Sequence, residues 1–220
     1  MCGKFTTKLS WTEMVDYIWR EPDRGDNDRT LSLRVMDEIP VIVWDGGDRQ
    51  VLRMRWGFPH HDDWRRPQPI HARGETIDTV KAFAQPFRDG QRGIVMMQTF
   101  NEAPDIKGPT IQHTITPDQP VGVAFVWRRF DIAGRDPLLA ACMVTVAANP
   151  LIGSLPTDRM PAVLAAEDWA VWLGEDEASP ERAKACLRTV DGVRWTMAKE
   201  ERAQKAPRRK PTVSDPAGLF

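Results

Sequence analysis

The sequence predicts a mixed domain of β-strands and α-helices in which strands outnumber helices. An Asp-Gly-Gly-Asp turn at 45–48 separates two β-prone runs, residues 39–44 and 50–56, and an Asp-Gly turn in this setting is the strongest short-range signal of a β-hairpin. Two further runs, residues 121–128 and 140–148, are almost continuously apolar, which is typical of buried core strands. These observations indicate a strand-rich domain with a few helices.

The N-terminal segments are predicted to form a strand, a helix and a loop. Residues 1–6 have the composition of a short strand. Ser10 precedes Glu13 by three residues, a capping-box pattern, and apolar residues recur at helical spacing, so a helix is predicted over residues 9–19. Residues 20–32 are charged and contain proline and glycine, which predicts an exposed loop.

The remaining elements are predicted from the residues that follow the hairpin in the sequence. Residues 91–100 read as one buried strand with Asn101 and Glu102 at its end, and carboxylates at strand ends are often placed for function on a rigid scaffold. The other predicted segments are a polar loop at 60–69, a helix that ends at 83, a strand and turn at 110–120, a proline-bracketed loop at 154–161, and helices at 165–173 and 180–190.

Length and charge limit the domain organisation. The chain has 220 residues, enough for one sizeable core, so residues 1–198 are predicted to form a single domain. Residues 199–220 are basic and carry several prolines, which is typical of a disordered tail. The formal net charge of −1 argues against a globally basic nucleic-acid binder, but it leaves room for a local basic cleft.

Cysteine usage and hydropathy indicate a cytoplasmic protein. Three cysteines, Cys2, Cys142 and Cys186, are scattered without Cys-x-x-Cys spacing, which indicates neither a disulfide framework nor a zinc site. No stretch approaches the ~18 apolar residues that span a bilayer, and the first residues lack the apolar segment of a signal peptide. We therefore expect a soluble monomer with no membrane contact.

Histidines offer one alternative site, for a metal. His60, His61 and His71 could supply imidazole ligands, but adjacent histidines in a polar loop are more often exposed to solvent. We expect neither a metal nor a cofactor.

The first three residues, Met1, Cys2 and Gly3, carry the strongest chemical signal. Once the initiator methionine is removed, Cys2 presents an amine with a pKa near ~8 and a thiol near ~8.5 on one carbon. The two groups can close a thiazolidine ring on an aldehyde, or the amine can act as general base for the thiol.

Five blocks of sequence resemble one known family. They are MCGKF at 1–5, RWGF at 55–58, HARGET at 71–76, TFNEA at 99–103 and TDRMP at 157–161. In this order they resemble the SOS-response-associated peptidase family, whose pattern has a Met-Cys-Gly start, Asn-Ala-Arg-x-Glu-Thr, a Gly-x-Tyr/Phe-Glu-Trp glutamate and His-Asp-Arg-Met-Pro. The resemblance implies an α+β fold with a largely antiparallel, barrel-like sheet flanked by helices.

The resemblance also implies a function. It implies binding of single-stranded DNA and covalent capture of abasic sites, in which the sugar aldehyde reacts with Cys2 to form a thiazolidine crosslink. The family is also credited with autoproteolytic exposure of this cysteine. No cofactor is implied.

Roles for individual residues follow from the matched blocks. Glu102 would shuttle protons, Arg73 would pair with a phosphate, and Trp56 would stack or wedge at the break in base stacking. A basic groove is predicted from Lys4, Arg53, Arg55 and Arg73. The predicted catalytic residues are Cys2, Glu102, His71 and Thr157, and the predicted DNA-binding residues are Gly3, Lys4, Trp56, Arg73 and Arg159.

Several positions depart from the family pattern. His71 stands where the family has asparagine, and Thr157 stands where it has histidine. If these two residues face each other with exchanged roles, His71 is expected to titrate near neutral pH as an acid or base. The other departures are Lys4 for arginine, Ala103 for tryptophan, and residues 34–37 in place of Asn-x-x-Pro.

Two other functions remain open. The chain could be a diverged paralogue that binds DNA without catalysis. It could also be an N-terminal-nucleophile glutamine amidotransferase, since those enzymes begin Met-Cys-Gly, but the Asn-Gly and Arg-Gly-x-Asp-like segments that they need are not found in the sequence.

Overall fold

The computed structural model describes residues 2–7, 31–104, 106 and 111–200. The helix predicted at 9–19, most of the loop predicted at 20–32, and residues 201–220 of the predicted tail lie outside this range. Among the described residues, no helix has the length and apolar character needed to cross a membrane.

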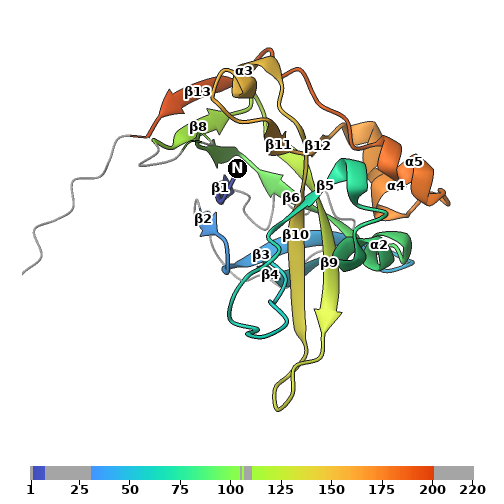
Figure 1. Ribbon diagram of the computed structural model, residues 1–220. Coiled ribbons are helices and arrows are strands. Elements are labelled where there is room, and N and C mark those ends of the chain that lie inside the picture. Colours follow the sequence, from blue (N-terminus) through green and yellow to red (C-terminus); the bar gives the residue numbers. More distant parts are fainter. Residues whose placement is uncertain (1, 8–30, 105, 107–110, 201–220) are drawn as a thin grey trace, which may run out of the picture.

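The described strands form two sheets (Figure 1). The smaller sheet has five strands, and all neighbouring strands in it run antiparallel. It arches across the upper left of Figure 1, and the first described strand of the chain lies in it between β7 and the edge strand β2. Its strands, in spatial order, are β13 (Thr196–Lys199), β8 (His113–Thr116), β7 (Thr99–Glu102), β1 (Lys4–Thr7) and β2 (Leu31–Arg34).

The larger sheet has eight strands and curves into a ring-like arrangement. Pairing runs from β10 through β4, β3, β6 and β9 and returns to β10, mostly antiparallel. Two of the joins are narrow, because β10 and β4 share two residue pairs and β3 and β6 share one, so the sheet is not a closed barrel. Its strands are β11 (Arg159–Pro161), β10 (Leu138–Ala147), β4 (Arg49–Trp56), β3 (Glu38–Trp44), β6 (Arg92–Met97), β9 (Val121–Phe130), β12 (Val163–Leu164) and β5 (His71–Arg73), which pairs with β10.

The predicted hairpin and fold class are confirmed. Strands β3 and β4 pair in the expected register, with Val41 opposite Leu52. The Asp45 side chain closes the turn by accepting hydrogen bonds from the Gly47 and Asp48 N–H groups at 3.0 and 2.9 Å. Gly46 takes a φ of +97°, a left-handed conformation that glycine adopts without steric cost.

The single strand predicted at 91–100 is wrong. The chain instead forms β6 and β7, which belong to different sheets and are separated at Gln98. The Gln98 N–H donates to the Thr6 carbonyl at 2.9 Å, so the chain leaves the larger sheet to pair with β1. No glycine or proline marks this break in the sequence. It places Glu102 on the strand beside the N-terminal strand.

The helices are short and gather mainly at one side, on the right of Figure 1. The helix predicted to end at residue 83 runs from Lys81 to Arg88 instead, and residues 74–76 before it form a separate 3₁₀ turn. The fully buried Trp172 anchors α4 by donating its indole N–H to the Gly93 carbonyl at 2.9 Å. The helices are η1 (Gly74–Thr76), α2 (Lys81–Arg88), α3 (Pro150–Gly153), η2 (Ala166–Asp168), α4 (Trp169–Leu173) and α5 (Pro180–Ala185).

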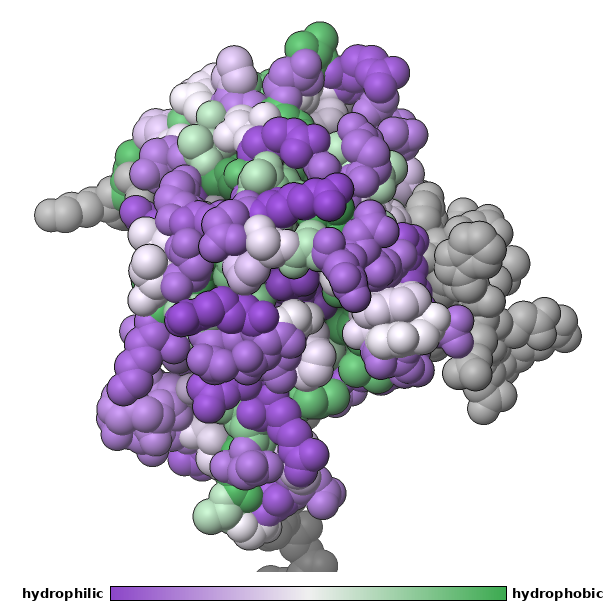
Figure 2. Space-filling view, turned by 90° about the vertical axis from the view of Figure 1, so that its right-hand side faces the viewer, coloured by the Kyte–Doolittle hydropathy of each residue, from purple (hydrophilic) through white to green (hydrophobic). Residues whose placement is uncertain are grey.

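The folded part of the chain extends to the end of the described residues. β13 pairs with β8 through Lys199, and the Glu200 N–H donates to the Gln112 carbonyl at 2.8 Å. Lys199, which follows the expected boundary at 198, therefore belongs to the sheet, and this hydrogen bond ties Glu200 to it. The face in Figure 2 is mostly hydrophilic, with apolar surface in small separate patches.

Candidate active site

Cys2 and Glu102 lie together because the first strand is inserted into the smaller sheet. β1 pairs with β7 in antiparallel register, with Phe5 opposite Phe100, so the residues before β1 run alongside the end of β7. The backbone N–H of Cys2 donates a hydrogen bond to the Glu102 carboxylate. Cys2 and Glu102 are each 1% exposed, so this contact is shielded from water. Two residues one hundred positions apart thus form one buried pair.

Glu102 is the group in this site that titrates near neutral pH. Burial raises the pKa of its carboxyl to about 7, although the hydrogen bond from the Cys2 N–H lowers the pKa in part. Desolvation disfavours the charged form of a carboxyl, which is the direction observed here. Both the acid and the base form of Glu102 are consequently populated at physiological pH.

His71 holds the other side of Cys2. β5 pairs in parallel with β10, with His71 beside Met143, and the His71 Nε2 lies 2.7 Å from the Cys2 carbonyl oxygen. Because a carbonyl oxygen only accepts, the Nε2 must carry the proton, which assigns the tautomer. The Nδ1 atom is buried and has no hydrogen-bond partner among the described residues.

The expectation that His71 titrates near neutral pH is wrong. Burial lowers the pKa of its imidazole to about 4, despite the opposing effect of the hydrogen bond to Cys2. His71 is therefore neutral at physiological pH and acts as a hydrogen-bond donor to the backbone.

The Cys2 thiol is held in its protonated form. Burial, and then the negative charge of Glu102, raise the pKa of the thiol to about 12. Its Sγ donates a weak hydrogen bond to the Lys4 carbonyl at 3.4 Å. The thiol is thus a poor nucleophile until a base removes its proton.

Thr157 and Arg159 are buried, but neither contacts Cys2 through a hydrogen bond. The Thr157 Oγ1 has no hydrogen-bond partner within the described part of the chain, so it makes no hydrogen bond to His71. The Arg159 guanidinium forks onto the Glu75 carboxylate at 2.6 and 2.8 Å and donates to the Thr145 carbonyl at 2.6 Å. These contacts brace β11 against η1 and β10, while the buried Arg159 Nε has no hydrogen-bond partner among the described residues.

Trp56 and Arg55 are core residues, which corrects their predicted DNA contacts. Trp56 is 0% exposed and packs against Phe5 and Phe125 at ring-centroid distances of 5.3 and 6.4 Å, so neither face of the indole is open to a base. Arg55 is also buried and donates to the Trp64 carbonyl at 2.7 Å. The sequence pattern cannot show this, since Trp and Arg are common both in cores and at nucleic-acid surfaces.

Arg53 and Arg73 are the exposed cations of the predicted groove. Neither forms an ion pair within the residues that the structure describes. Lys4, in contrast, forms an ion pair of 2.6 Å with Glu200, a residue that sequence reasoning did not single out. Gly3 is exposed at the start of β1 and offers its backbone to solvent.

Comparison with known proteins gives the family. Residues 1–202 match the model of the family described as SOS response associated peptidase (SRAP). The chain belongs to the SRAP family. Among curated relatives, the abasic site processing protein YoqW of Bacillus subtilis is 23% identical over 202 residues, covering 87% of this chain and 88% of YoqW. The abasic site processing protein YobE of the same species is 22% identical over 200 residues, covering 87% and 90%.

Solved structures show the same fold. A protein from Bordetella bronchiseptica superposes on this SRAP chain with a TM-score of 0.74 at 18% identity, covering 91% of this chain and 100% of that one. A protein from Bacteroides thetaiotaomicron gives a TM-score of 0.67 at 20% identity, covering 78% of each chain.

One departure from the SRAP pattern gains a structural explanation. The side chain at position 71 donates a hydrogen bond to the Cys2 carbonyl, and the asparagine of the family pattern also carries an N–H donor.

Proposed function

We propose that this SRAP protein binds single-stranded DNA and captures abasic sites covalently through Cys2. The relatives named as abasic site processing proteins support the substrate class. The observation that carries the proposal is the contact between the Cys2 backbone nitrogen and Glu102, a buried carboxyl with a pKa of about 7. When Met1 is removed, this nitrogen becomes a primary amine beside a group that can give and take protons at neutral pH.

The reaction follows from the states of these groups. The amine adds to the aldehyde carbon of the ring-opened sugar to give a carbinolamine. The acid form of Glu102 protonates the hydroxyl, which leaves as water, and an iminium ion remains. The Cys2 sulfur then bonds to the same carbon as the thiol proton passes to the Glu102 carboxylate. One aldehyde and one aminothiol thus give one thiazolidine and one water.

The order of the two additions follows from the protonation of Cys2. With a pKa of about 12, the thiol is almost entirely neutral at pH 7, whereas an α-amine is deprotonated in part. The amine therefore attacks first. Only a free amine can add to the aldehyde, so the release of Met1 must precede capture. In the chain that still carries residue 1, Cys2 is 1% exposed.

An intact-mass measurement tests the proposed function directly. Protein whose mass shows that Met1 is absent is incubated with a single strand that carries one abasic site. We expect a denaturation-resistant species with the summed mass minus one water. A strand whose aldehyde has been reduced with borohydride is the matched control and should give no adduct. If the unreduced strand also gives none, the non-catalytic binding module takes the place of this proposal.

The role of His71 is tested by two substitutions. His71→Ala removes the donor to the Cys2 carbonyl and should slow capture at least tenfold, because the reacting residue is no longer held. His71→Asn keeps an N–H donor and should restore most of the rate. Thr157→Ala should have a smaller effect than His71→Ala, since its hydroxyl makes no hydrogen bond with described residues.

The pH profile separates positioning from proton transfer. Because the pKa of His71 is about 4, the His71→Ala rate should keep the wild-type dependence between pH 6 and 7.5. A profile that changes shape in this window would show that His71 exchanges protons during capture.

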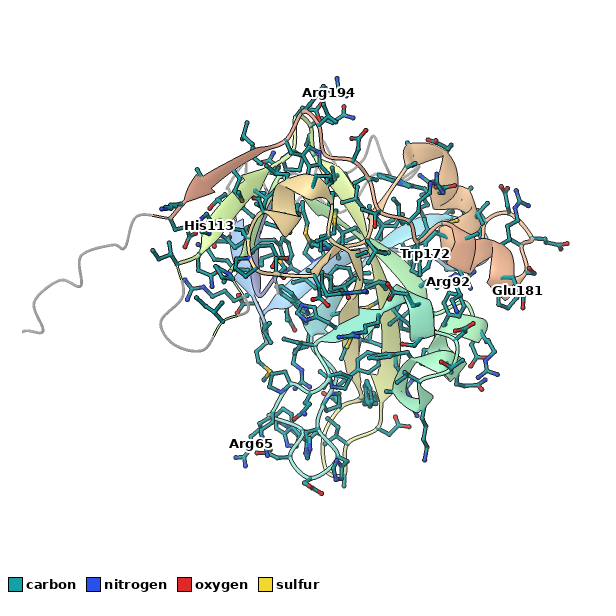
Figure 3. All side chains as sticks on the ribbon, turned by 45° about the horizontal axis from the view of Figure 1, so that its top comes forward. Arg65, Arg92, His113, Trp172, Glu181 and Arg194 are labelled. Atoms are coloured by element: carbon teal, nitrogen blue, oxygen red, sulfur yellow. The ribbon has the colours of Figure 1, made fainter. Side chains whose placement is uncertain are left out.

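DNA binding should depend on salt through the exposed arginines. Each phosphate neutralised on a single strand contributes a slope of about −0.7 in log K against log salt. Arg73→Ala should therefore make the slope shallower by about 0.7, while Arg182→Ala, an exposed arginine on α5 beside the Glu181 labelled in Figure 3, should leave it unchanged. If the Arg73→Ala slope equals the wild-type slope, Arg73 does not contact a DNA phosphate.

A further inference from the structure

We propose that the loop between Pro59 and Pro67 binds a divalent transition-metal ion through His60, His61 and Asp62. One ligand atom from each of the three residues lies within 4.8 Å of the other two. The two imidazole rings stack at a centroid distance of 4.2 Å, and the Asp62 carboxylate lies 3.1 Å from the His61 Nε2 and 3.8 Å from the His60 Nδ1. Zinc–nitrogen and zinc–oxygen bonds are ~2.0–2.2 Å long, so ligand atoms around one tetrahedral ion lie roughly 3.3 Å apart, which is close to the two separations from the Asp62 carboxylate.

The loop that carries the three ligands is braced. Its ends meet in a bridge between Pro59 and Pro67, and the His60 N–H donates to the Arg66 carbonyl at 2.9 Å. The buried guanidinium of Arg55 on β4 donates to the Trp64 carbonyl at 2.7 Å, which ties the loop to the larger sheet. The backbone that presents the ligands is therefore ordered in advance, and binding an ion loses little further conformational entropy.

The state of His60 suits metal binding. Its Nδ1 accepts a hydrogen bond from the Asp62 N–H at 3.2 Å, so the lone pair of this nitrogen faces the backbone of the same loop. An ion of higher affinity can displace this long hydrogen bond. A metal ligand must be a deprotonated nitrogen.

The ligand set selects the class of ion. Two imidazoles and one carboxylate suit zinc, nickel, cobalt or copper, whereas magnesium and calcium prefer oxygen ligands alone. The neighbouring Asp63 is held by Arg65 at 2.9 Å and is not available to the cluster. The side chains of His61 and Asp62 are 79% and 71% exposed, so the remaining coordination positions of the ion face solvent.

This loop is remote from the proposed capture site. Figure 3 shows Arg65 of the loop at the lower end of the molecule, well separated from His113 on β8. His113 is the cross-strand neighbour of Glu102. The proposed ion is therefore independent of the capture chemistry, and each proposal can fail without the other.

Calorimetric titration of zinc chloride into protein that carries no affinity tag tests the site. We expect binding to one site, which His61→Ala and Asp62→Ala should each weaken at least tenfold. Both side chains are largely exposed, so neither substitution should disturb folding. Asp63→Asn in the same loop is the matched control and should bind as the wild type does.

The N-terminal cysteine can itself chelate zinc and must be separated from the loop. Cys2→Ser should retain the binding, and cobalt bound to the protein should show no sulfur charge-transfer absorption. Zinc binding that is absent, that survives His61→Ala unchanged, or that disappears only with Cys2→Ser would overturn the proposal.

Discussion

Cys2→Ala is expected to abolish stable capture of an abasic strand. The alanine amine can still form an imine with the sugar aldehyde, but without sulfur the imine cannot close to a thiazolidine and hydrolyses. Denaturing gels should therefore show no adduct. Borohydride, which reduces an imine to a stable amine, should recover a crosslink in the variant. The loss is complete because a bond-forming atom has been removed, not a group that assists.

The other buried cysteines supply the control for this prediction. Cys186→Ala removes a buried thiol in the segment after α5, outside the contacts of Cys2, and should capture abasic DNA as the wild type does. A stable adduct formed by Cys2→Ala without reductant would place the nucleophile elsewhere in the chain.

Glu102→Gln is expected to slow capture by about 10²-fold or more, within the range that general acid–base groups supply. The amide keeps the shape of the carboxyl and can accept the Cys2 N–H, but it cannot donate a proton to the leaving hydroxyl or receive one from the thiol. The wild-type rate should change with an apparent pKa near 7, and this inflection should be absent from the variant. Affinity for an intact single strand should change little.

Stability at two pH values shows whether the slower rate of Glu102→Gln reflects chemistry or misfolding. The folded state raises the pKa of Glu102 from 4.5 to about 7, so it retains a proton that the unfolded chain releases. Wild-type stability from this group is therefore fully present below pH 4.5 and is lost as the pH rises through 7. At pH 8, Glu102→Gln should be more stable than the wild type by up to about 3 kcal/mol, since a shift of one unit corresponds to about 1.4 kcal/mol.

Urea unfolding at pH 8 and at pH 4.5 measures this difference. The advantage of the variant should disappear at the lower pH. A variant that captures slowly and is also less stable than the wild type at pH 8 would show that the carboxyl holds the fold, and the proton-transfer role would be withdrawn.

Local features of the fold were predictable from the sequence because neighbouring residues determine them. The hairpin follows from Asp45 and Gly46, whose side-chain acceptor and left-handed φ make the turn irrespective of distant contacts. The break that separates β6 from β7 at Gln98 was not predictable, since it arises from pairing with β1 nearly a hundred residues earlier. The short strand β5 was also not predictable from hydrophobic periodicity, because three residues are too few to show an alternating pattern.

The candidate site divides in the same way. The sequence alone was sufficient to name Cys2, Glu102 and His71, because each falls in a block that resembles the SRAP pattern and each carries a group suited to proton or aldehyde chemistry. Only the tertiary structure decided that Glu102, not His71, has a pKa near neutral pH, and that the indole of Trp56 is in the core. The reason is physical: desolvation depends on what packs around a group, and packing is set by residues far away in the sequence.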